Sequence, residues 1–216
     1  METAPFKNML SALLEMSGGL LGRVEPSLRA VAVDLDHEQE LYICYFYYDG
    51  LIDEYKRDLV SCAATEASGN WVTAEHYIQL DYPAPIPVNG MLAYLRKEPE
   101  FYPPIIQLLP RGPKTLSESY LAYALQEGLL GRIIPSLRYT LISIDDNEKK
   151  MNFYFYYDEK ITAEVLALSK EAVDIAKTAF PPDYTSTETI EFVPFPESFP
   201  EGGTRSVYRR NEHQYD

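Results

Sequence analysis

Gly19-Leu20-Leu21-Gly22-Arg23-Val24-Glu25-Pro26-Ser27-Leu28-Arg29 decides the fold of this chain, because it returns as Gly128-Leu129-Leu130-Gly131-Arg132-Ile133-Ile134-Pro135-Ser136-Leu137-Arg138. At the same spacing of 109 positions (128 − 19), Tyr45-Phe46-Tyr47-Tyr48-Asp49 returns as Tyr154-Phe155-Tyr156-Tyr157-Asp158. Residues 19–49 and 128–158 align without a gap, and 15 of their 31 positions are identical. A fixed spacing of this length predicts two copies of one folding unit, each about the size of a small domain.

Each copy is predicted to fold in the order α-β-β-α-β-β. Apolar residues at helical spacing indicate the helices, and β-branched and aromatic runs between polar turns indicate the strands. In the first copy we expect helices over 6–16, ended by Gly18-Gly19, and over 53–67, with strands over 28–36, 41–48, 76–82 and 91–97. In the second copy we expect a helix before Gly128 and another over 162–180, with strands over 137–145, 151–157, 187–193 and 205–209.

These elements predict an α+β fold of two tandem modules, residues 1–98 and 115–216. Each module is expected to be a four-stranded, mainly antiparallel sheet with two helices on one face. Residues 99–114 between them are rich in proline, which predicts a stiff, extended connector.

The net charge of −14, from 19 basic and 33 acidic residues, restricts the possible partners. A negative field repels phosphate backbones and attracts cationic partners, so direct binding to nucleic acid is not expected. The acidity is also consistent with a role in solubility alone. Cys44 and Cys62 do not suggest a disulfide framework, and no apolar run is long enough to cross a membrane. We therefore expect a cytoplasmic protein without a membrane segment.

Few residues are candidates for catalysis or metal binding. The three histidines, His37, His76 and His213, have no counterparts at the repeat-related positions. No phosphate-binding glycine loop, zinc spacing or nucleophile-elbow serine is present. Acidic pairs such as Asp34 with Asp36 fall at the end of a predicted hairpin, where a solvated turn is the expected role. The sequence therefore predicts a protein that is not an enzyme and holds no metal and no cofactor.

The repeated Gly-to-Arg block allows a structural and a functional interpretation. In the structural one, glycine and proline end a helix and set the entry into a strand, and the arginines bridge carboxylates on the sheet. In the functional one, Arg23, Arg29, Arg132 and Arg138 form an anion site. The surrounding negative charge favours the structural interpretation.

The tyrosines of the second strand divide between the two faces of the sheet. Strand periodicity puts Phe46 with Tyr42, Cys44 and Tyr48 on the face toward the helices, and Tyr45 and Tyr47 on the opposite face. Tyr154 and Tyr156 have the same placement in the second copy. The opposite faces are expected to be covered within the monomer, by each other or by the connector, or to form a partner surface, or to be exposed.

The repeated Leu-Leu-Gly-Arg-x-x-Pro-Ser-Leu-Arg block, followed by Tyr-Phe-Tyr-Tyr-Asp, resembles small bacterial immunity-type proteins that accompany polymorphic and contact-dependent toxins. The likeness continues through Ala64-Thr65-Glu66, Leu80-Asp81-Tyr82-Pro83 and Tyr94–Glu98. It implies a tandem duplication of one such module, acting in contact-dependent growth inhibition. The second copy has Phe192-Val193-Pro194-Phe195 where the first has Leu80-Asp81-Tyr82-Pro83, so the copies need not share one binding role.

Together these features predict a non-enzymatic immunity protein that binds a cognate protein toxin, of a basic nuclease type, and blocks its active site or substrate groove. Homo-oligomers are left open. The contacts are expected from Asp34, Asp36, Glu38, Glu40, Asp53, Glu54 and Asp58, with Tyr45 and Tyr47 if their face is open. The alternatives are an adaptor or regulatory protein acting through a homodimer or another protein contact, and a small-molecule enzyme using clustered acids.

Overall fold

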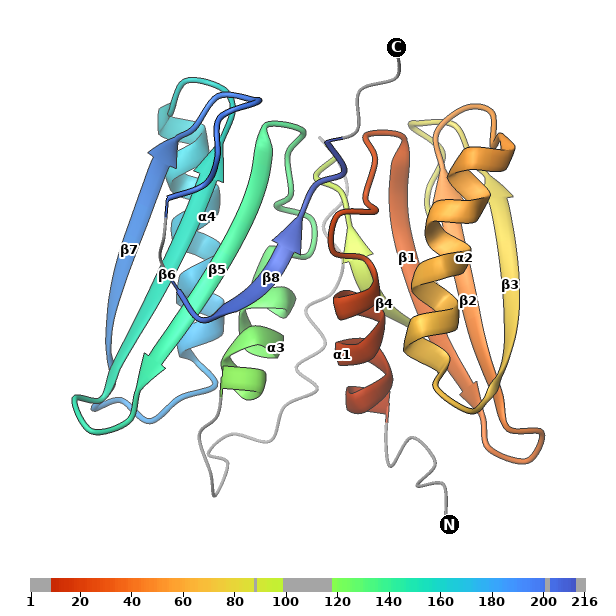
Figure 1. The fold of residues 1–216 in the computed structure, drawn as a ribbon, viewed down its shortest axis with the longest axis horizontal. Helices are drawn as coiled ribbons and strands as arrows, with labels where there is room; N and C mark the ends of the chain where they lie inside the picture. Colours follow the sequence, from red (N-terminus) through yellow and green to blue (C-terminus); the bar gives the residue numbers. More distant parts are fainter. Residues whose placement is uncertain (1–8, 88, 99–117, 201–202, 213–216) are drawn as a thin grey trace. The chain divides into compact units, whose positions relative to one another are not determined.

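The computed structural model describes residues 9–87, 89–98, 118–200 and 203–212 (Figure 1). The predicted connector, residues 99–114, lies outside the described residues. The chain forms two compact units: unit 1 comprises Met1–Arg96 with Asn211–Asp216, and unit 2 comprises Lys97–Arg210.

Each unit follows the order α-β-β-α-β-β, which confirms the predicted α+β layout. Unit 1 contains α1 (Met9–Gly19), β1 (Leu28–Asp36), β2 (Leu41–Tyr48), α2 (Glu54–Ser68), β3 (Val72–Gln79) and β4 (Met91–Leu95). Unit 2 contains α3 (Glu118–Leu129), β5 (Leu137–Asp145), β6 (Lys150–Tyr157), α4 (Ala163–Lys177), β7 (Thr185–Phe192) and β8 (Arg205–Arg209).

The two sheets are mixed and have the same topology, with strand orders β3-β2-β1-β4 and β7-β6-β5-β8. β1 is antiparallel to both β2 and β4, whereas β3 runs parallel to β2. The parallel pair arises because α2 carries the chain back along the sheet before β3 begins, as a crossover connection requires. β3 and β4 therefore lie at opposite edges, and the proline-rich segment between them must pass from one edge to the other.

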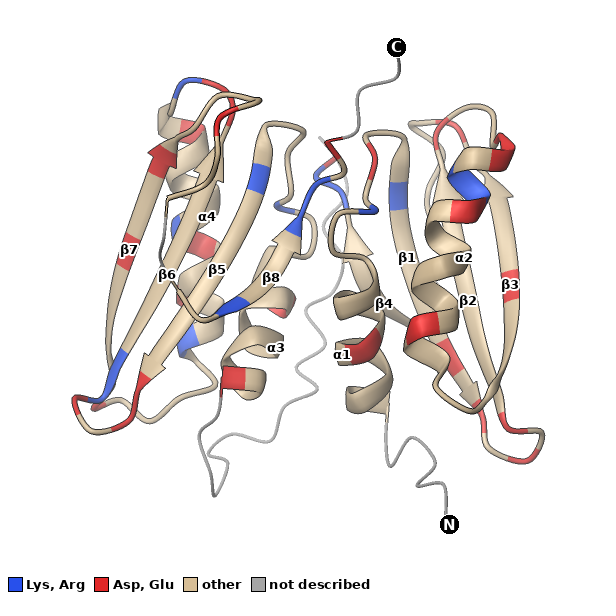
Figure 2. Ribbon diagram, viewed as in Figure 1, with Lys and Arg blue, Asp and Glu red and all other residues tan. Residues whose placement is uncertain are grey.

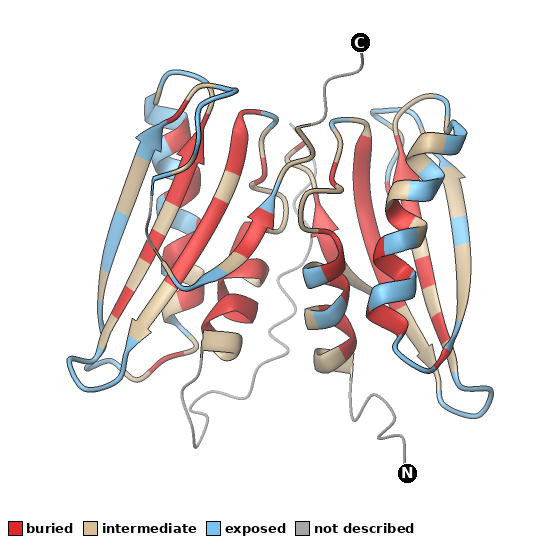
Figure 3. Ribbon diagram, viewed as in Figure 1, coloured by how far each residue is buried: buried red, intermediate tan, exposed pale blue. Residues whose placement is uncertain are grey.

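The helices cover the face that carries Phe46, as the strand periodicity predicts. Tyr42 donates its hydroxyl to the carbonyl of Ala12 in α1 at 2.7 Å, and Tyr48 donates to the carbonyl of Lys56 in α2 at 3.2 Å. These buried tyrosines pack their rings in the core and satisfy their polar ends on helix backbone. In Figure 3 the buried residues, in red, follow the central strands and the sheet-facing sides of the helices.

Several element boundaries differ from the sequence prediction, and two of the differences have a direct structural explanation. β3 begins at Val72, four residues before the predicted start at His76, because the Val72 amide donates to the carbonyl of Glu40 beside β2. α1 continues to Gly19 instead of ending before the glycine pair, and the left-handed residue that turns the chain is Gly22, with φ of 75°. A single segment does not reveal pairing with a distant strand, which explains the first difference.

One buried polar atom distinguishes the core of unit 2. Thr140 on β5 is fully buried, and its hydroxyl has no hydrogen-bond partner among the described residues. Val31 occupies the repeat-related position on β1 (140 − 109 = 31) and is equally buried. Unit 1 therefore accommodates an apolar residue at the position that Thr140 occupies in unit 2.

We expect Thr140→Val to raise the free energy of unfolding of unit 2 by about 1–2 kcal/mol, because it removes an unsatisfied buried hydroxyl. The reciprocal Val31→Thr should lower that of unit 1 by about 1–3 kcal/mol. Urea unfolding of the full chain, with amide hydrogen exchange on β1 and β5, assigns each change to a unit. A destabilising Thr140→Val would mean that the hydroxyl is satisfied in solution.

Candidate functional site

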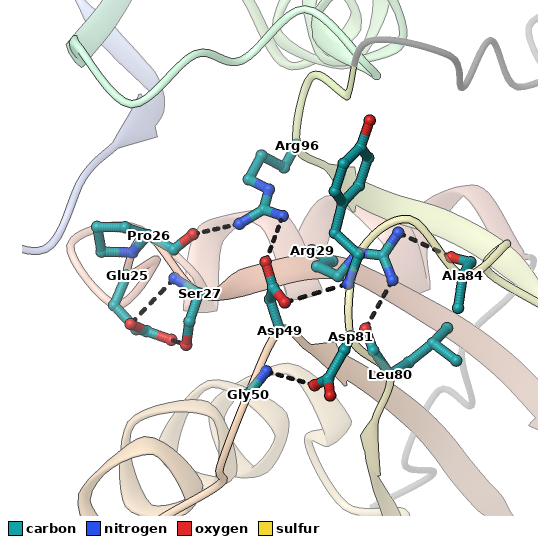
Figure 4. A network of polar contacts seen from close by, with 11 residues as sticks. Glu25, Pro26, Ser27, Arg29, Asp49, Gly50, Leu80, Asp81, Ala84 and Arg96 are labelled. Carbon is teal, nitrogen blue, oxygen red and sulfur yellow. Dashed lines mark hydrogen bonds and ion pairs between the residues drawn. The ribbon is translucent and has the colours of Figure 1, made fainter.

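The repeated sequence block builds a structural network in each unit, shown for unit 1 in Figure 4. Arg96 donates to the carbonyl of Pro26 at 2.7 Å and pairs with Asp49 at 3.3 Å. The hydrogen bond from the Tyr82 amide lowers the pKa of Asp49, and the pairing with Arg96 acts in the same direction. In unit 2, Arg210 makes the same two contacts with Pro135 and Asp158.

The first arginine of each block forms an ion pair with the second helix of its unit. Arg23 pairs with Glu66 of α2 at 2.7 Å, and Arg132 pairs with Glu171 of α4 at 3.2 Å. Arg23 and Arg132 therefore do bridge carboxylates, but these carboxylates lie on the helices and not on the sheet as predicted. All four carboxylate and guanidinium groups are at least partly exposed, so each pair contributes under about 1 kcal/mol.

The second arginine of each block is buried and holds the proline-rich segment against the sheet. Arg29 donates to the carbonyls of Leu80 at 2.6 Å and Ala84 at 2.9 Å (Figure 4). Arg138 donates to the carbonyls of Val193 at 2.7 Å and Glu197 at 3.2 Å. Both arginines therefore donate to main-chain carbonyl oxygens. This structural role favours the structural interpretation of the block over an anion site.

The held segments cover the tyrosine faces. Tyr47 has an exposed fraction of 0%, and its hydroxyl donates to the carbonyl of Pro87 at 2.6 Å. Tyr156 of unit 2 is buried with Leu141 and Val193, and Phe199 packs against them. The condition attached to Tyr47 as a contact is therefore not met, because the proline-rich segment of its own unit removes it from the accessible surface.

Tyr45 remains half-buried beside the covered part of the face. Its ring stacks on that of His76 on β3, with ring centroids 4.9 Å apart. Tyr45 therefore stays a candidate contact, presented together with an exposed histidine that the sequence did not single out.

The seven predicted acidic contacts divide between the two ends of unit 1. Asp34, Asp36, Glu38 and Glu40 lie at or beside the β1–β2 hairpin, where β2 begins at Leu41. Asp53, Glu54 and Asp58 lie at the start of α2, beyond Tyr48 at the other end of β2. Seven strand steps of about 3.3 Å separate Leu41 from Tyr48, or about 23 Å. The acids therefore form two separate groups (Figure 2).

At the hairpin end the acids have local structural roles as well as charge. Asp36 accepts from the amides of Glu38 and Gln39, which fixes the turn. Glu40 has a φ of 53°, and its unit 2 counterpart Lys149 has a φ of 52°. Among the described residues, none of the ion pairs involves an acid of this hairpin. Glu38 and Glu40 are exposed.

At the start of α2, Asp53 is the N-cap residue, and its carboxylate accepts from the Lys56 amide at 2.9 Å. Glu54 and Asp58 follow on the exposed surface of the first turns. Acidic side chains are favoured there by the helix dipole, so this group is stabilised locally without a cation.

The sequence reasoning missed two apolar residues beside the second acidic group. Leu51 is 78% exposed and Tyr82 is 40% exposed. The Gly50 amide donates to Asp81 and the Tyr82 amide donates to Asp49, so the two segments that carry Leu51 and Tyr82 are bonded together. The separation of the two segments in the sequence hid the hydrogen bonds between them.

The two units differ in charge at repeat-related positions. The hairpin acids Asp34, Glu38 and Glu40 correspond to Ser143, Asn147 and Lys149 in unit 2. The α2 acids Asp53, Glu54 and Asp58 correspond to Thr162, Ala163 and Ala167. The shared scaffold thus carries concentrated negative charge on unit 1 and a more balanced surface on unit 2, where Lys149 pairs with Asp183.

The proline-rich segments also align differently from the sequence comparison. The Leu80 amide donates to the carbonyl of Tyr48, and the Val193 amide donates to that of Tyr157. Leu80 therefore corresponds to Val193, not to Phe192, and Tyr82 corresponds to Phe195. The aromatic position is kept in both units, whereas Asp81 is replaced by Pro194.

Two of the groups with shifted pKa values, Cys44 and Tyr42, belong to the core. Burial raises the pKa of the Cys44 thiol and of the Tyr42 hydroxyl, so both stay protonated at neutral pH and neither is an activated nucleophile. Within the described residues, no three His, Cys, Asp or Glu side chains are placed to hold a metal ion. No described helix is both long and apolar enough to span a membrane.

Two segments of the chain, residues 10–98 and 118–212, match the family model described as MafI2 immunity protein. The two matched segments correspond to the two repeats. No curated protein sequence matches the chain.

Proposed function

The chain belongs to the MafI2 immunity protein family, and from this premise we propose that it binds a basic, nuclease-type toxin and blocks the toxin's active site or substrate groove. An immunity function implies a toxin as the partner. The protein acts by contact and not by catalysis.

The observation that carries this proposal is the pair of acidic groups on unit 1, at the hairpin and at the start of α2, whose acids take part in no ion pair within the described part of the chain. Acids at both ends of unit 1 are exposed, and their counterparts in unit 2 are mostly neutral or basic. A nuclease must present Lys and Arg to the phosphates of its substrate, so an acidic protein surface is complementary to that groove. Complementary charge speeds the encounter and disfavours other partners, while desolvated apolar contacts slow dissociation.

The proposal is tested with the full-length protein and the product of the adjacent upstream gene as the candidate toxin, inactivated for purification. We expect the two to co-purify, and co-expression to protect cells from the active toxin. The association rate constant should fall steeply as NaCl is raised, because the attraction is screened, while the dissociation rate constant changes little. Absence of both binding and protection would refute an immunity role toward that toxin.

The nuclease part of the proposal has its own measurement. The active toxin should cleave RNA or DNA, one equivalent of this protein should stop the cleavage, and added nucleic acid should compete with this protein for the toxin. Binding and protection without any nuclease activity would reject the nuclease class while leaving the immunity function in place.

A further inference from the structure

We propose that the toxin-binding centre of this protein is the α2-start patch of unit 1, defined as Leu51, Asp53, Glu54, Asp81 and Tyr82. This inference rests on the proposed function and deepens it by naming the contact surface. The occupant is a Lys- and Arg-bearing surface of the toxin that also places an apolar side chain on Leu51 and Tyr82. The hairpin acids act only at long range.

The patch combines the two properties of a protein-binding centre. Leu51 and Tyr82 are large apolar side chains with exposed fractions of 78% and 40%, and tyrosine is enriched among residues that dominate binding. Asp53, Glu54 and Asp81 are exposed, and among the described residues none of them takes part in an ion pair. An apolar centre with charges at its rim is the usual arrangement of such interfaces.

The patch is held in place before any partner arrives. The Arg29 guanidinium lies 5.8 Å from the centroid of the Tyr82 ring, so one side of the ring rests on a buried cation. Gly50 is bonded to Asp81 at 2.9 Å, and the Lys56 ammonium donates to the carbonyl of Leu51 at 2.7 Å. Because these contacts fix both segments, little ordering is left to oppose binding. Lys56, the cation nearest this turn in the sequence, is thereby tied to the main chain.

Comparison with unit 2 shows which features of the patch are shared by both units and which are particular to unit 1. Tyr82 corresponds to Phe195, which also lies over a buried arginine, Arg138, at 5.6 Å. The rest of the patch changes: Leu51, Asp53 and Glu54 become Lys160, Thr162 and Ala163. The scaffold is thus shared, but the charge pattern that fits a basic partner is present only in unit 1.

The repeat provides a test variant and a charge-matched control, because residues found at the repeat-related positions of unit 2 can be introduced into unit 1. The patch swap, Leu51→Lys with Asp53→Thr and Glu54→Ala, introduces the unit 2 residues and raises the net charge by three. It keeps a helix cap, since Thr162 caps α4 by accepting from the Val165 amide. The hairpin swap, Glu38→Asn with Glu40→Lys, also introduces unit 2 residues and raises the net charge by three. Lys149 shows that lysine fits the conformation of Glu40.

Binding of the inactivated toxin to each full-length variant is measured by surface plasmon resonance, after circular dichroism and thermal unfolding have confirmed that each variant is folded. We expect the patch swap to weaken Kd at least about 100-fold, mainly through faster dissociation. The hairpin swap should weaken Kd less than about fivefold, through slower association that high salt abolishes.

Any other outcome contradicts the proposal that the α2-start patch is the toxin-binding centre. Equal losses in the two swaps would mean that net charge alone matters, and a larger loss in the hairpin swap would move the centre to the other end of unit 1. A homodimer of the wild type that dissociates in the patch swap would identify a second copy as the occupant. If the wild type binds and the patch swap binds equally well, the patch is wrong but the proposed function stands; if the wild type does not bind, both fail.

Discussion

Arg138→Met is expected to lower the free energy of unfolding of unit 2 by about 3–5 kcal/mol, the largest effect of any substitution considered for this chain. The reason is that one buried guanidinium donates to two carbonyls, those of Val193 and Glu197, and lies 4.5 Å from the ring centroid of Phe199. Hydrogen bonds from a charged donor contribute about 1.5–3 kcal/mol each, and the cation–π contact adds about 0.5–2 kcal/mol. Methionine fills part of the space but leaves the carbonyls without this donor.

Urea unfolding of the full chain measures the loss, and amide hydrogen exchange locates it. Protection should fall in β5, β6 and the segment after β7, while unit 1 keeps its exchange pattern. Lys170→Met serves as the control, because Lys170 forms an exposed i,i+4 pair with Asp174 and its removal should change stability by under about 0.5 kcal/mol. Equal effects of the two substitutions would show that the Arg138 contacts contribute nothing to stability.

Gly19→Ala is expected to lower the free energy of unfolding of unit 1 by about 1–3 kcal/mol, although alanine is the better helix former by about 1 kcal/mol. The cause is the close approach of α1 to α2. A Cβ atom at Gly19 would lie 2.6 Å from the main-chain oxygen of Ala63, which cannot move away without shifting α2. Gly128 of α3 meets Ala172 of α4 in the same way, so the first glycine of the repeated block serves helix contact in both units.

The neighbouring glycine gives a matched control for this prediction. Gly18 is exposed and in the same helix, and no atom lies within 4 Å of the position of its Cβ. Gly18→Ala should therefore raise the free energy of unfolding by about 0.5–1 kcal/mol through helix propensity alone. Opposite signs at two adjacent positions, measured by urea unfolding, are the expected result; stabilisation at both would mean that the helices separate at little cost.

The fold could be predicted largely because the repeat removed ambiguity. Each weak strand or helix signal occurred twice at one spacing, so the order α-β-β-α-β-β did not rest on a single segment. The parallel pairing of β3 with β2 was not visible, because a local pattern does not say which distant strand it joins. Burial of Tyr42 and Tyr48 against the helices followed from the period of two along β2.

The candidate site was predicted less completely, for reasons that particular residues show. Acidic residues were identified from composition, but only the three-dimensional path of β2 separates Glu38 and Glu40 from Asp53 and Glu54. Tyr47 had the face that strand periodicity predicts, yet a segment 40 positions further along the chain, at Pro87, covers it. Nothing in the sequence indicated that Leu51 and Tyr82 belong to neighbouring segments, because these segments are joined by the hydrogen bonds of Gly50 with Asp81 and of Tyr82 with Asp49.

The anchoring of the proline-rich segments by Arg29 and Arg138 has a consequence for how such a protein can diversify. The acceptors are peptide oxygens, which every residue supplies whatever its side chain. Substitutions within the anchored loop therefore leave its attachment intact, as the unlike residues Asp81 and Pro194 illustrate. The exposed side chains of this loop can therefore change as the toxin changes, while the buried guanidinium continues to hold the same backbone conformation.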